Sequence, residues 1–189
     1  MCRAWSLVVV IFMAAWASAQ APAAGNVFFG YSYENADSTA IGLTTNRPNM
    51  QGWDAQLEGK IFPHIGIVTD LGGNYGSQSA VDLPNGGSGS ATGHEFKVLF
   101  GPRVAIPIGK FTPFGEFMVG VAHINVNVSE TVPVGDPSNT SFANAVGGGV
   151  DYRIIRPVAW RFEGDYIQTR FFSATQNDIR ISTGIVIRF

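Results

Sequence analysis

Apolar and polar residues alternate one by one over the last stretch of the chain, residues 178–189. One side of the alternation is apolar or aromatic and consists of Ile179, Ile181, Ile185, Ile187 and Phe189. The other side carries two guanidinium groups, those of Arg180 and Arg188. Successive side chains of a β-strand point to opposite faces, so this period of two predicts a strand with one apolar and one polar face.

The same alternation recurs seven times earlier in the chain. The stretches that carry it are 26–35, 51–61, 65–75, 96–104, 114–122, 142–152 and 158–166. Pro102 falls inside one of them and predicts a bulge or a missing ladder bond, because proline has no amide hydrogen to donate. Together with the last stretch, the pattern predicts an all-β chain of eight strands.

The connections between these strands alternate between long and short. The long ones are rich in polar residues and glycine, which is typical of loops, and they span 36–50, 76–93, 125–140 and 168–177. The short ones span 62–64, 106–112 and 153–157. A soluble β-sandwich also shows alternating faces but has no reason to show this rhythm. Long loops outside the cell and short periplasmic turns are typical of bacterial membrane barrels.

We therefore predict a single eight-stranded antiparallel up-and-down transmembrane β-barrel with both termini in the periplasm. The final stretch is long enough for a tilted membrane-spanning strand. An even number of strands lets the sheet close without a free edge, which lipid requires because it cannot satisfy unpaired backbone groups.

The first residues have the features of a secretory signal peptide. Arg3 precedes an apolar stretch over 5–15, and small residues at Ala17 and Ala19 provide a cleavage site before Gln20. We predict a signal peptide over 1–19, a short leader over 20–25 and a barrel domain over 26–189. The apolar stretch is too short to remain as a spanning helix.

The composition excludes several kinds of site and partner. Cys2 is the only cysteine and leaves with the signal, so the mature chain is expected to have no disulfide, thiol nucleophile or thiolate metal site. Loss of Arg3 changes the formal charge from −2 to −3, which gives no reason to expect nucleic-acid binding. The 23 glycines and the 12% of aromatic residues are typical of turn-rich all-β chains.

Charges of both signs fall on the faces predicted to point inward. The carboxylates are those of Glu34, Asp54, Glu58, Asp70, Glu116, Asp151, Glu163 and Asp165, and the cations are those of Lys60, Lys97, Arg103, Arg161, Arg180 and Arg188. Side chains fill an eight-stranded barrel, and an isolated buried charge costs several kcal/mol. All of these residues except Glu34, Asp54 and Asp70 are assigned to a lumenal ion-pair network.

Two features of the last hairpins refine this prediction. A turn centred near 172–173 places Asp165 directly opposite Arg180 as a cross-strand ion pair. Glycines at 147–149 would make room beside Arg161 and Glu163. A phosphate-binding glycine loop is the alternative for this run, but the lysine and helix that such a loop needs are missing.

The end of the chain, Ser182-x-Gly184-x-x-Ile187-x-Phe189, resembles the C-terminal signal by which outer-membrane barrels are handed to their assembly machinery. With the signal peptide, the loop rhythm and the stretches 147–152 and 165–169, the chain resembles the small eight-stranded outer-membrane barrels of Gram-negative bacteria, the outer membrane protein A and X type and the generic outer-membrane β-barrel domain. The resemblance covers essentially the whole mature chain. It implies an outer-membrane monomer in contact with lipid and lipopolysaccharide, with no cofactor. The chain stops at Phe189, so we expect no peptidoglycan-binding domain.

Three functions are compatible with such a barrel, because a fold alone does not determine function. We expect a non-enzymatic protein that supports envelope integrity or presents loops to the outside. A narrow passive pore is the first alternative, gated by lumenal ion pairs, with Glu116 facing Lys97 and Arg103.

A lipid A-modifying enzyme is the second alternative, and it needs a nucleophile and a base at the outer rim. A pairing centred on 108–109 would place His94 opposite His123 there, whereas His64 falls in a periplasmic turn. Ser90 and Ser129 would lie nearby, Glu95 points inward and Glu130 falls in the loop. No ordered Ser-His-acid arrangement follows. We expect two interfacial histidines without a catalytic role, and a metal site on the pair would need more ligands.

Overall fold

The computed structural model describes residues 24–35, 49–82, 88–129, 138–170 and 175–189. The predicted signal peptide, the connection over 36–48, Glu130 and the turn near 172–173 lie outside the described residues. Eight strands make up most of the described chain: β1 (Gly25–Asn35), β2 (Asn49–Phe62), β3 (Ile65–Asp82), β4 (Ser88–Ala105), β5 (Phe111–Ser129), β6 (Ser138–Ile155), β7 (Val158–Thr169) and β8 (Gln176–Arg188).

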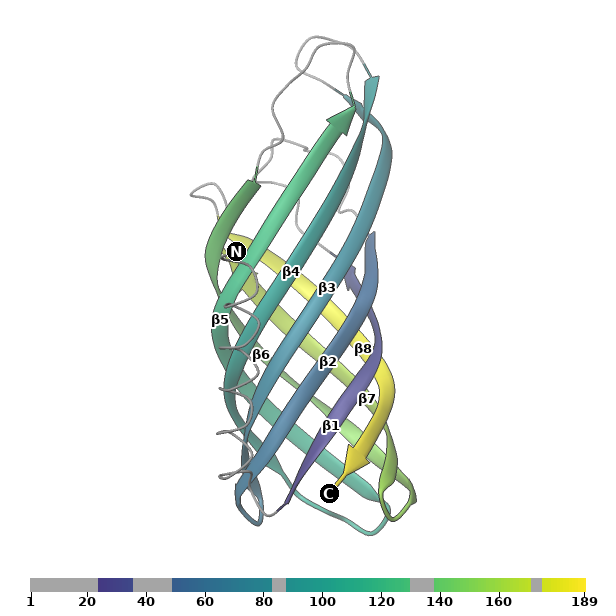
Figure 1. Cartoon of the computed structure of the whole chain (residues 1–189), viewed down its shortest axis with the longest axis vertical. Helices are drawn as coiled ribbons and strands as arrows, with labels where there is room; N and C mark the ends of the chain where they lie inside the picture. Colours follow the sequence, from purple (N-terminus) through teal and green to yellow (C-terminus); the bar gives the residue numbers. More distant parts are fainter. Residues whose placement is uncertain (1–23, 36–48, 83–87, 130–137, 171–174) are drawn as a thin grey trace, which may run out of the picture.

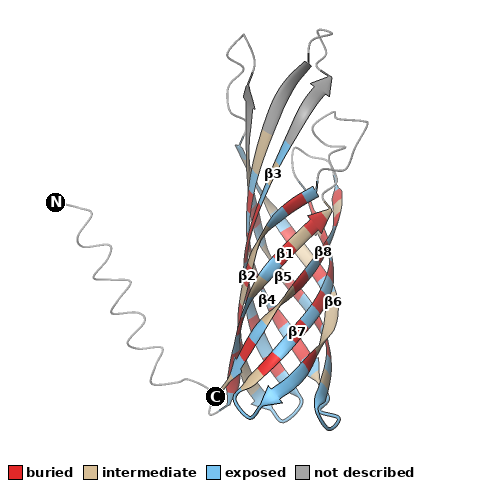
Figure 2. Ribbon diagram, turned by 90° about the vertical axis from the view of Figure 1, so that its right-hand side faces the viewer, coloured by how far each residue is buried: buried red, intermediate tan, exposed pale blue. Residues whose placement is uncertain are grey.

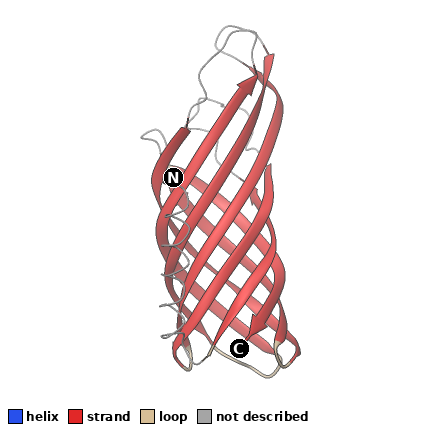
Figure 3. Ribbon diagram, in the orientation of Figure 1, coloured by secondary structure: helices blue, strands red, loops and turns tan. Residues whose placement is uncertain are grey.

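Each strand pairs antiparallel with the next one along the chain, and β8 pairs antiparallel with β1. The result is one closed barrel of tilted strands (Figure 1), with strand structure throughout (Figure 3). The predicted all-β, eight-stranded antiparallel barrel is therefore confirmed. Among the described residues, no helix is long and apolar enough to cross a membrane.

Buried and exposed residues alternate along the strands, as bands of two colours in Figure 2 make visible. In β7, Phe162 is 56% exposed while its neighbour Glu163 is completely buried. Trp160 also faces outward, and its indole nitrogen donates a hydrogen bond to Thr183 Oγ1 at 2.8 Å. The apolar faces therefore cover the outside of the barrel and the charged faces line its interior, which is the reverse of a soluble sandwich.

The two ends of the barrel differ. At one end, which we call the turn end, β1 begins, β8 stops and three short connections lie. The opposite end, which we call the loop end, carries the longer connections, and β3, β4 and β5 rise above the rest of the barrel there (Figure 1). The last pair between β2 and β3 is Gln51 with Tyr75, whereas β3 continues to Asp82 beside β4.

This extension corrects two of the expected loops. Residues 76–82 and 88–93 were expected to be loop, and 125–129 and 138–140 likewise, but all of them belong to strands. Glycine and serine are poor strand formers, yet the outer part of β3 is a strand because its backbone pairs with β4. One register shift falls between Ser79 and Val81. The fourth predicted loop is also shorter than expected, since β7 runs to Thr169 and β8 begins at Gln176.

The register around Pro102 agrees with the expected gap in the ladder. The pairing of β4 with β5 includes Phe100 with Val119 and Arg103 with Glu116, but it skips Gly101 and Pro102. Proline cannot donate to the neighbouring strand, so the missing ladder bond is confirmed.

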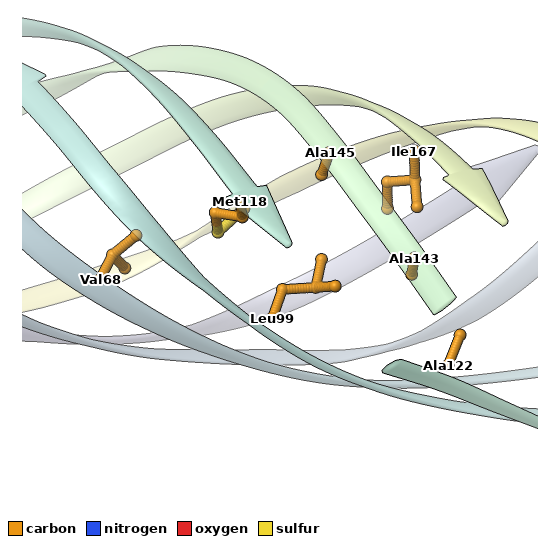
Figure 4. Close-up of a cluster of buried hydrophobic side chains, with 7 residues drawn as sticks. All are labelled: Val68, Leu99, Met118, Ala122, Ala143, Ala145 and Ile167. Atoms are coloured by element: carbon orange, nitrogen blue, oxygen red, sulfur yellow. The ribbon is translucent and has the colours of Figure 1, made fainter. Parts of the chain in front are cut away.

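A part of the interior is apolar. Seven side chains from β3 to β7 form a cluster there (Figure 4): Val68, Leu99, Met118, Ala122, Ala143, Ala145 and Ile167. All seven are completely buried. The lumen is thus filled by apolar side chains as well as by charged ones, and Val68 and Leu99 pair across the ladder with Glu58 and Asp70.

Candidate functional site in the barrel lumen

The described interior contains ten buried carboxylates and four buried cations. The carboxylates are those of Glu34, Asp54, Glu58, Asp70, Glu95, Glu116, Asp151, Glu163, Asp165 and Asp178, and the cations are those of Lys97, Arg103, Arg161 and Arg180. Strand alternation turns all of them inward, because each occupies the face opposite the exposed apolar residues. Lys60 and Arg188 are half-buried where the lumen opens at the turn end.

Arg180 on β8 joins carboxylates from three other strands. Its Nη2 lies 2.8 Å from Asp165 Oδ2 on β7 and 2.6 Å from Asp70 Oδ2 on β3. Asp54 on β2 is more distant, at 4.0 Å from Nη1. Asp165 is also the Cα partner of Arg180 in the β7–β8 pairing, as the sequence predicted. The guanidinium therefore ties one side of the barrel to the other.

Gln56 on β2 connects the Arg180 group to a second group of charges. Its amide nitrogen donates to Asp70 Oδ2 at 3.0 Å and to Glu163 Oε1 at 2.7 Å. Its amide oxygen accepts from Arg103 Nη2 at 2.6 Å and from Arg161 Nη1 at 2.7 Å. One neutral side chain thus makes four hydrogen bonds in the middle of the ionic network.

Arg103 and Arg161 form the second group with their own carboxylates. Arg103 pairs with Glu116, the residue opposite it on β5. Arg161 pairs with Asp151 at 2.7 Å. The two guanidiniums also lie 4.4 and 4.6 Å from the centre of the Phe114 ring, within cation–π distance.

A third group lies around Lys97 on β4. Its ammonium is 2.5 Å from Glu34 Oε1 and 3.1 Å from Glu95 Oε2. Asn74 donates a further hydrogen bond to Glu34 Oε2 at 2.5 Å. Lys97 therefore contacts Glu34 and Glu95, and Glu116 pairs with Arg103. The expected contact between Glu116 and Lys97 is wrong, because six positions along each strand separate the pair Lys97 and Ala122 from the pair Arg103 and Glu116.

The structure brings most of the predicted network together. Arg188 lies 3.3 Å from Asp151, and Arg103 lies 3.3 Å from Glu58 and 3.5 Å from Glu163. Lys60 is the exception, because it makes no ion pair with any residue that the structure describes. It lines a cavity of about 120 Å³ at the turn end together with Glu58, Arg103 and Arg188.

Several members of the network were missed at the sequence level. Gln56 and Asn74 are neutral, so charge does not single them out, although alternation places both on inward faces. Glu34 was placed inward without a partner, and its partner Lys97 lies 63 positions away in the chain. Asn26 was also missed and donates to Glu58 Oε2 at 2.8 Å.

Three groups of buried carboxylates have spacing compatible with a metal ion: Glu34 with Glu95 and Asp178, Asp54 with Asp70 and Glu163, and Glu116 with Glu163 and Asp165. Each group lies beside a lysine or an arginine that contacts at least one of its members. We therefore assign these carboxylates to the ionic network.

The glycines at 147 and 149 leave the room that the sequence suggested. A Cβ on Gly147 would collide with Oδ1 of Asp165, and a Cβ on Gly149 would approach the backbone of Glu163. These two glycines pair with Asp165 and Glu163 across the β6–β7 ladder. Gly147 therefore makes room for the carboxylate of Asp165, and Gly149 makes room for the neighbouring β7 backbone and the Phe114 ring.

The two histidines at the loop end do not face each other. The pairing of β4 with β5 places His94 opposite Asn125, and His123 opposite Phe96. The expected register is wrong by two residues, because the tight turn uses Gly109 and Lys110, where Gly109 has a φ of 64° that glycine readily adopts. His94 packs edge-on against Tyr75, and His123 Nδ1 lies 2.8 Å from Thr140 Oγ1.

The four residues of the predicted assembly signal lie on β8 and at its end. Ser182 is buried and Ile187 is exposed. Gly184 pairs with Gly30 of β1, where a Cβ would collide with the β1 backbone. Phe189 exchanges two backbone hydrogen bonds with Gly25, at 3.0 and 3.1 Å, where β8 meets β1. Recognition of these residues by an assembly machinery stays a prediction.

Solved structures with the same architecture are small barrels from bacterial surfaces. Neisserial surface protein A aligns with a TM-score of 0.66 at 12% identity, covering 88% of this chain and 99% of that one. Ail, the attachment invasion locus protein of Yersinia pestis, aligns with a TM-score of 0.63 at 14% identity, covering 89% and 99%. The outer membrane protein OprG from Pseudomonas aeruginosa aligns with a TM-score of 0.56 at 10% identity, covering 89% and 96%.

The chain has the fold of the small outer-membrane β-barrels. Because the sequence identities are low, this likeness establishes the fold and nothing further about function. No protein-family model and no curated protein matches the chain. Within this fold, the apolar exterior and the ion-paired interior are the features from which a function can be argued.

Proposed function

We propose that this protein is a non-enzymatic integral protein of the bacterial outer membrane, which supports envelope integrity or presents its extended hairpins at the cell surface. The exterior supports the membrane location, because side chains such as Phe29, Phe100 and Phe162 are more than half exposed and would be costly in water. The architecture shared with OprG and Neisserial surface protein A supports the same location.

The filled lumen is the observation that supports a barrel which does not conduct ions. Arg103, Arg161 and Arg180 come from three different strands and are at most 1% exposed. Gln56 bonds to Arg103 and Arg161 directly, and it is linked to Arg180 through Asp70. Ions crossing the lumen would have to separate buried charge pairs, and breaking one such pair costs about 3–5 kcal/mol. A static scaffold fits this interior better than a pore does.

The hairpins at the loop end supply the surface for presentation. β3, β4 and β5 continue above the level at which β2 leaves the sheet, and they remain paired with one another up to Ser90 and Ser129. Their outer parts are rich in serine, glycine and asparagine. We assign this end to the cell exterior and both termini to the periplasm, as the loop rhythm of bacterial barrels suggests.

Single-cysteine labelling tests this orientation. Cys2 is the only cysteine of the chain and is expected to leave with the signal peptide, so Cys2→Ser serves only to exclude labelling of uncleaved precursor. Ser138→Cys then places a thiol on an exposed residue at the loop end, and Lys110→Cys places one on an exposed polar position at the turn end. In intact cells a membrane-impermeant maleimide should label the first variant, and it should label the second only after the outer membrane is permeabilised. The opposite pattern would contradict the proposed orientation.

The lipid-modifying alternative has little support in the geometry of the histidines. His94 and His123 contact Tyr75 and Thr140, and they are not cross-strand partners. We expect the mass spectrum of lipid A to be the same in cells that express the protein and in cells that lack it. A new lipid A species that disappears with His94→Ala or His123→Ala would overturn the non-enzymatic proposal.

A further inference from the structure

The turn end of the barrel is a rim of positive charge. Five cations lie there: Lys60, Lys110, Arg153, Arg156 and Arg188. Three of them, Lys110, Arg153 and Arg156, are exposed on the turns themselves. Every carboxylate whose side chain the structure describes is buried in the lumen. Arg188 pairs with Asp151 at the mouth of the lumen, at 3.3 Å, but among the described residues no acidic side chain is exposed at this end to neutralise Lys110, Arg153 and Arg156.

Backbone contacts hold the neighbouring turns in one ring. The amide of Arg153 donates to the carbonyl of Lys110 at 2.8 Å, and its guanidinium donates to the carbonyl of Gly109 at 2.9 Å. The amide of Arg188 donates to the carbonyl of Pro157 at 2.7 Å. The cations thus belong to one fixed rim, although they come from different hairpins.

Exposed apolar side chains lie directly beside these cations. Ile108 and Phe111 flank Lys110 on one turn, and Ile154 and Ile155 lie between Arg153 and Arg156 on the next. All four apolar side chains are more than half exposed. Exposed apolar side chains are most stable among lipid acyl chains, whereas the cations are most stable in the polar headgroup layer. Their combination on one turn is typical of the boundary between hydrocarbon and headgroups, where lipid phosphates lie.

We propose that this rim binds anionic phospholipids, with Lys110, Arg153 and Arg156 contacting their headgroup phosphates. The inference rests on the proposed membrane location. The interleaved apolar residues favour a lipid over a soluble polyanion, which would gain nothing from them. Each cation close to an anionic membrane surface raises binding about fivefold.

Two tryptophans make this inference measurable. Trp160 faces outward on β7, four residues beyond Arg156, and Trp53 lies on β2, four residues from the start of the strand at the loop end. The remaining tryptophans, Trp5 and Trp16, fall in the predicted signal peptide. In one variant Trp5, Trp16 and Trp53 are replaced by phenylalanine, which leaves Trp160 as the single reporter. In the other, Trp5, Trp16 and Trp160 are replaced, which leaves Trp53.

The full-length single-tryptophan variants are folded into phosphatidylcholine vesicles that contain a small fraction of dibrominated lipid, which quenches tryptophan on contact. Brominated phosphatidylglycerol should quench Trp160 about twofold more than brominated phosphatidylcholine at the same mole fraction, and high salt should reduce the difference. Trp53 serves as the matched control and should respond equally to both lipids. Replacing Lys110, Arg153 and Arg156 by glutamine should abolish the preference at Trp160.

The outcomes separate this inference from the proposed function. Equal quenching of Trp160 by the two lipids would overturn anionic lipid binding while leaving the membrane location intact. No quenching of either tryptophan by either lipid would mean that the barrel is not embedded, and both proposals would fail. If the triple variant does not fold, Arg156→Gln alone should still lower the preference, and an unchanged preference would overturn the inference.

Discussion

Removal of the Arg180 side chain is the sharpest test of the ionic lumen. Arg180 donates two hydrogen bonds to Asp165, at 2.8 and 3.0 Å, and two to Asp70, at 2.6 and 3.1 Å. Arg180→Met keeps most of the volume but leaves both carboxylates buried without their cation. Removing one partner of a buried ion pair costs about 3–5 kcal/mol, so we expect the free energy of unfolding to fall by this amount.

The assay is reversible urea unfolding in lipid vesicles, followed by tryptophan fluorescence. Arg170→Met is the control, because Arg170 is exposed at the end of β7 and its replacement should change the free energy of unfolding by about 0.5 kcal/mol or less. The double variant Arg180→Met with Asp165→Asn should recover part of the loss, because it removes one uncompensated charge. A loss below about 1 kcal/mol for Arg180→Met would refute the reasoning.

Three further predictions concern the wall, the end and the interior of the barrel. Gly147→Ala should lower the free energy of unfolding by about 1–3 kcal/mol in the same urea assay, because the new Cβ displaces Asp165, whereas Gly164→Ala, whose Cβ would only make an ordinary van der Waals contact, should be neutral. Phe189→Ala should reduce the amount of folded barrel in isolated outer membranes, and an unchanged amount would argue against the C-terminal signal. Glu116→Ala removes the carboxylate that pairs with Arg103 and should raise single-channel conductance in planar bilayers if a charge gate closes the lumen; no conductance in either form would rule out that gate.

Much of the architecture could be predicted from the sequence, because one residue of register decides whether a side chain meets lipid or the lumen. Phe162 and Glu163 are neighbours of opposite character, and the structure places them on opposite faces. The cross-strand pair of Asp165 and Arg180 followed from the length of a single hairpin. Local patterns of this kind need no knowledge of distant strands.

The rest depended on features that a linear pattern does not contain. The β4–β5 register differs by two residues from the expected one, since the backbone conformation of Gly109 selects the turn. Composition alone misassigned 76–82 as loop, because pairing with β4 overrides the weak strand preference of glycine and serine. The role of Gln56 depends on the convergence of Asp70, Arg103, Arg161 and Glu163 from other strands around the closed barrel.

The central claim is that the interior of the barrel is closed by its own ion pairs. Planar-bilayer recording on the purified wild-type protein tests it most directly, with membranes that contain the inserted barrel. The ion pairs around Gln56 and Arg180 predict a silent bilayer at physiological salt. Stable single-channel steps from the wild-type protein would show that ions pass the lumen, and would contradict the account.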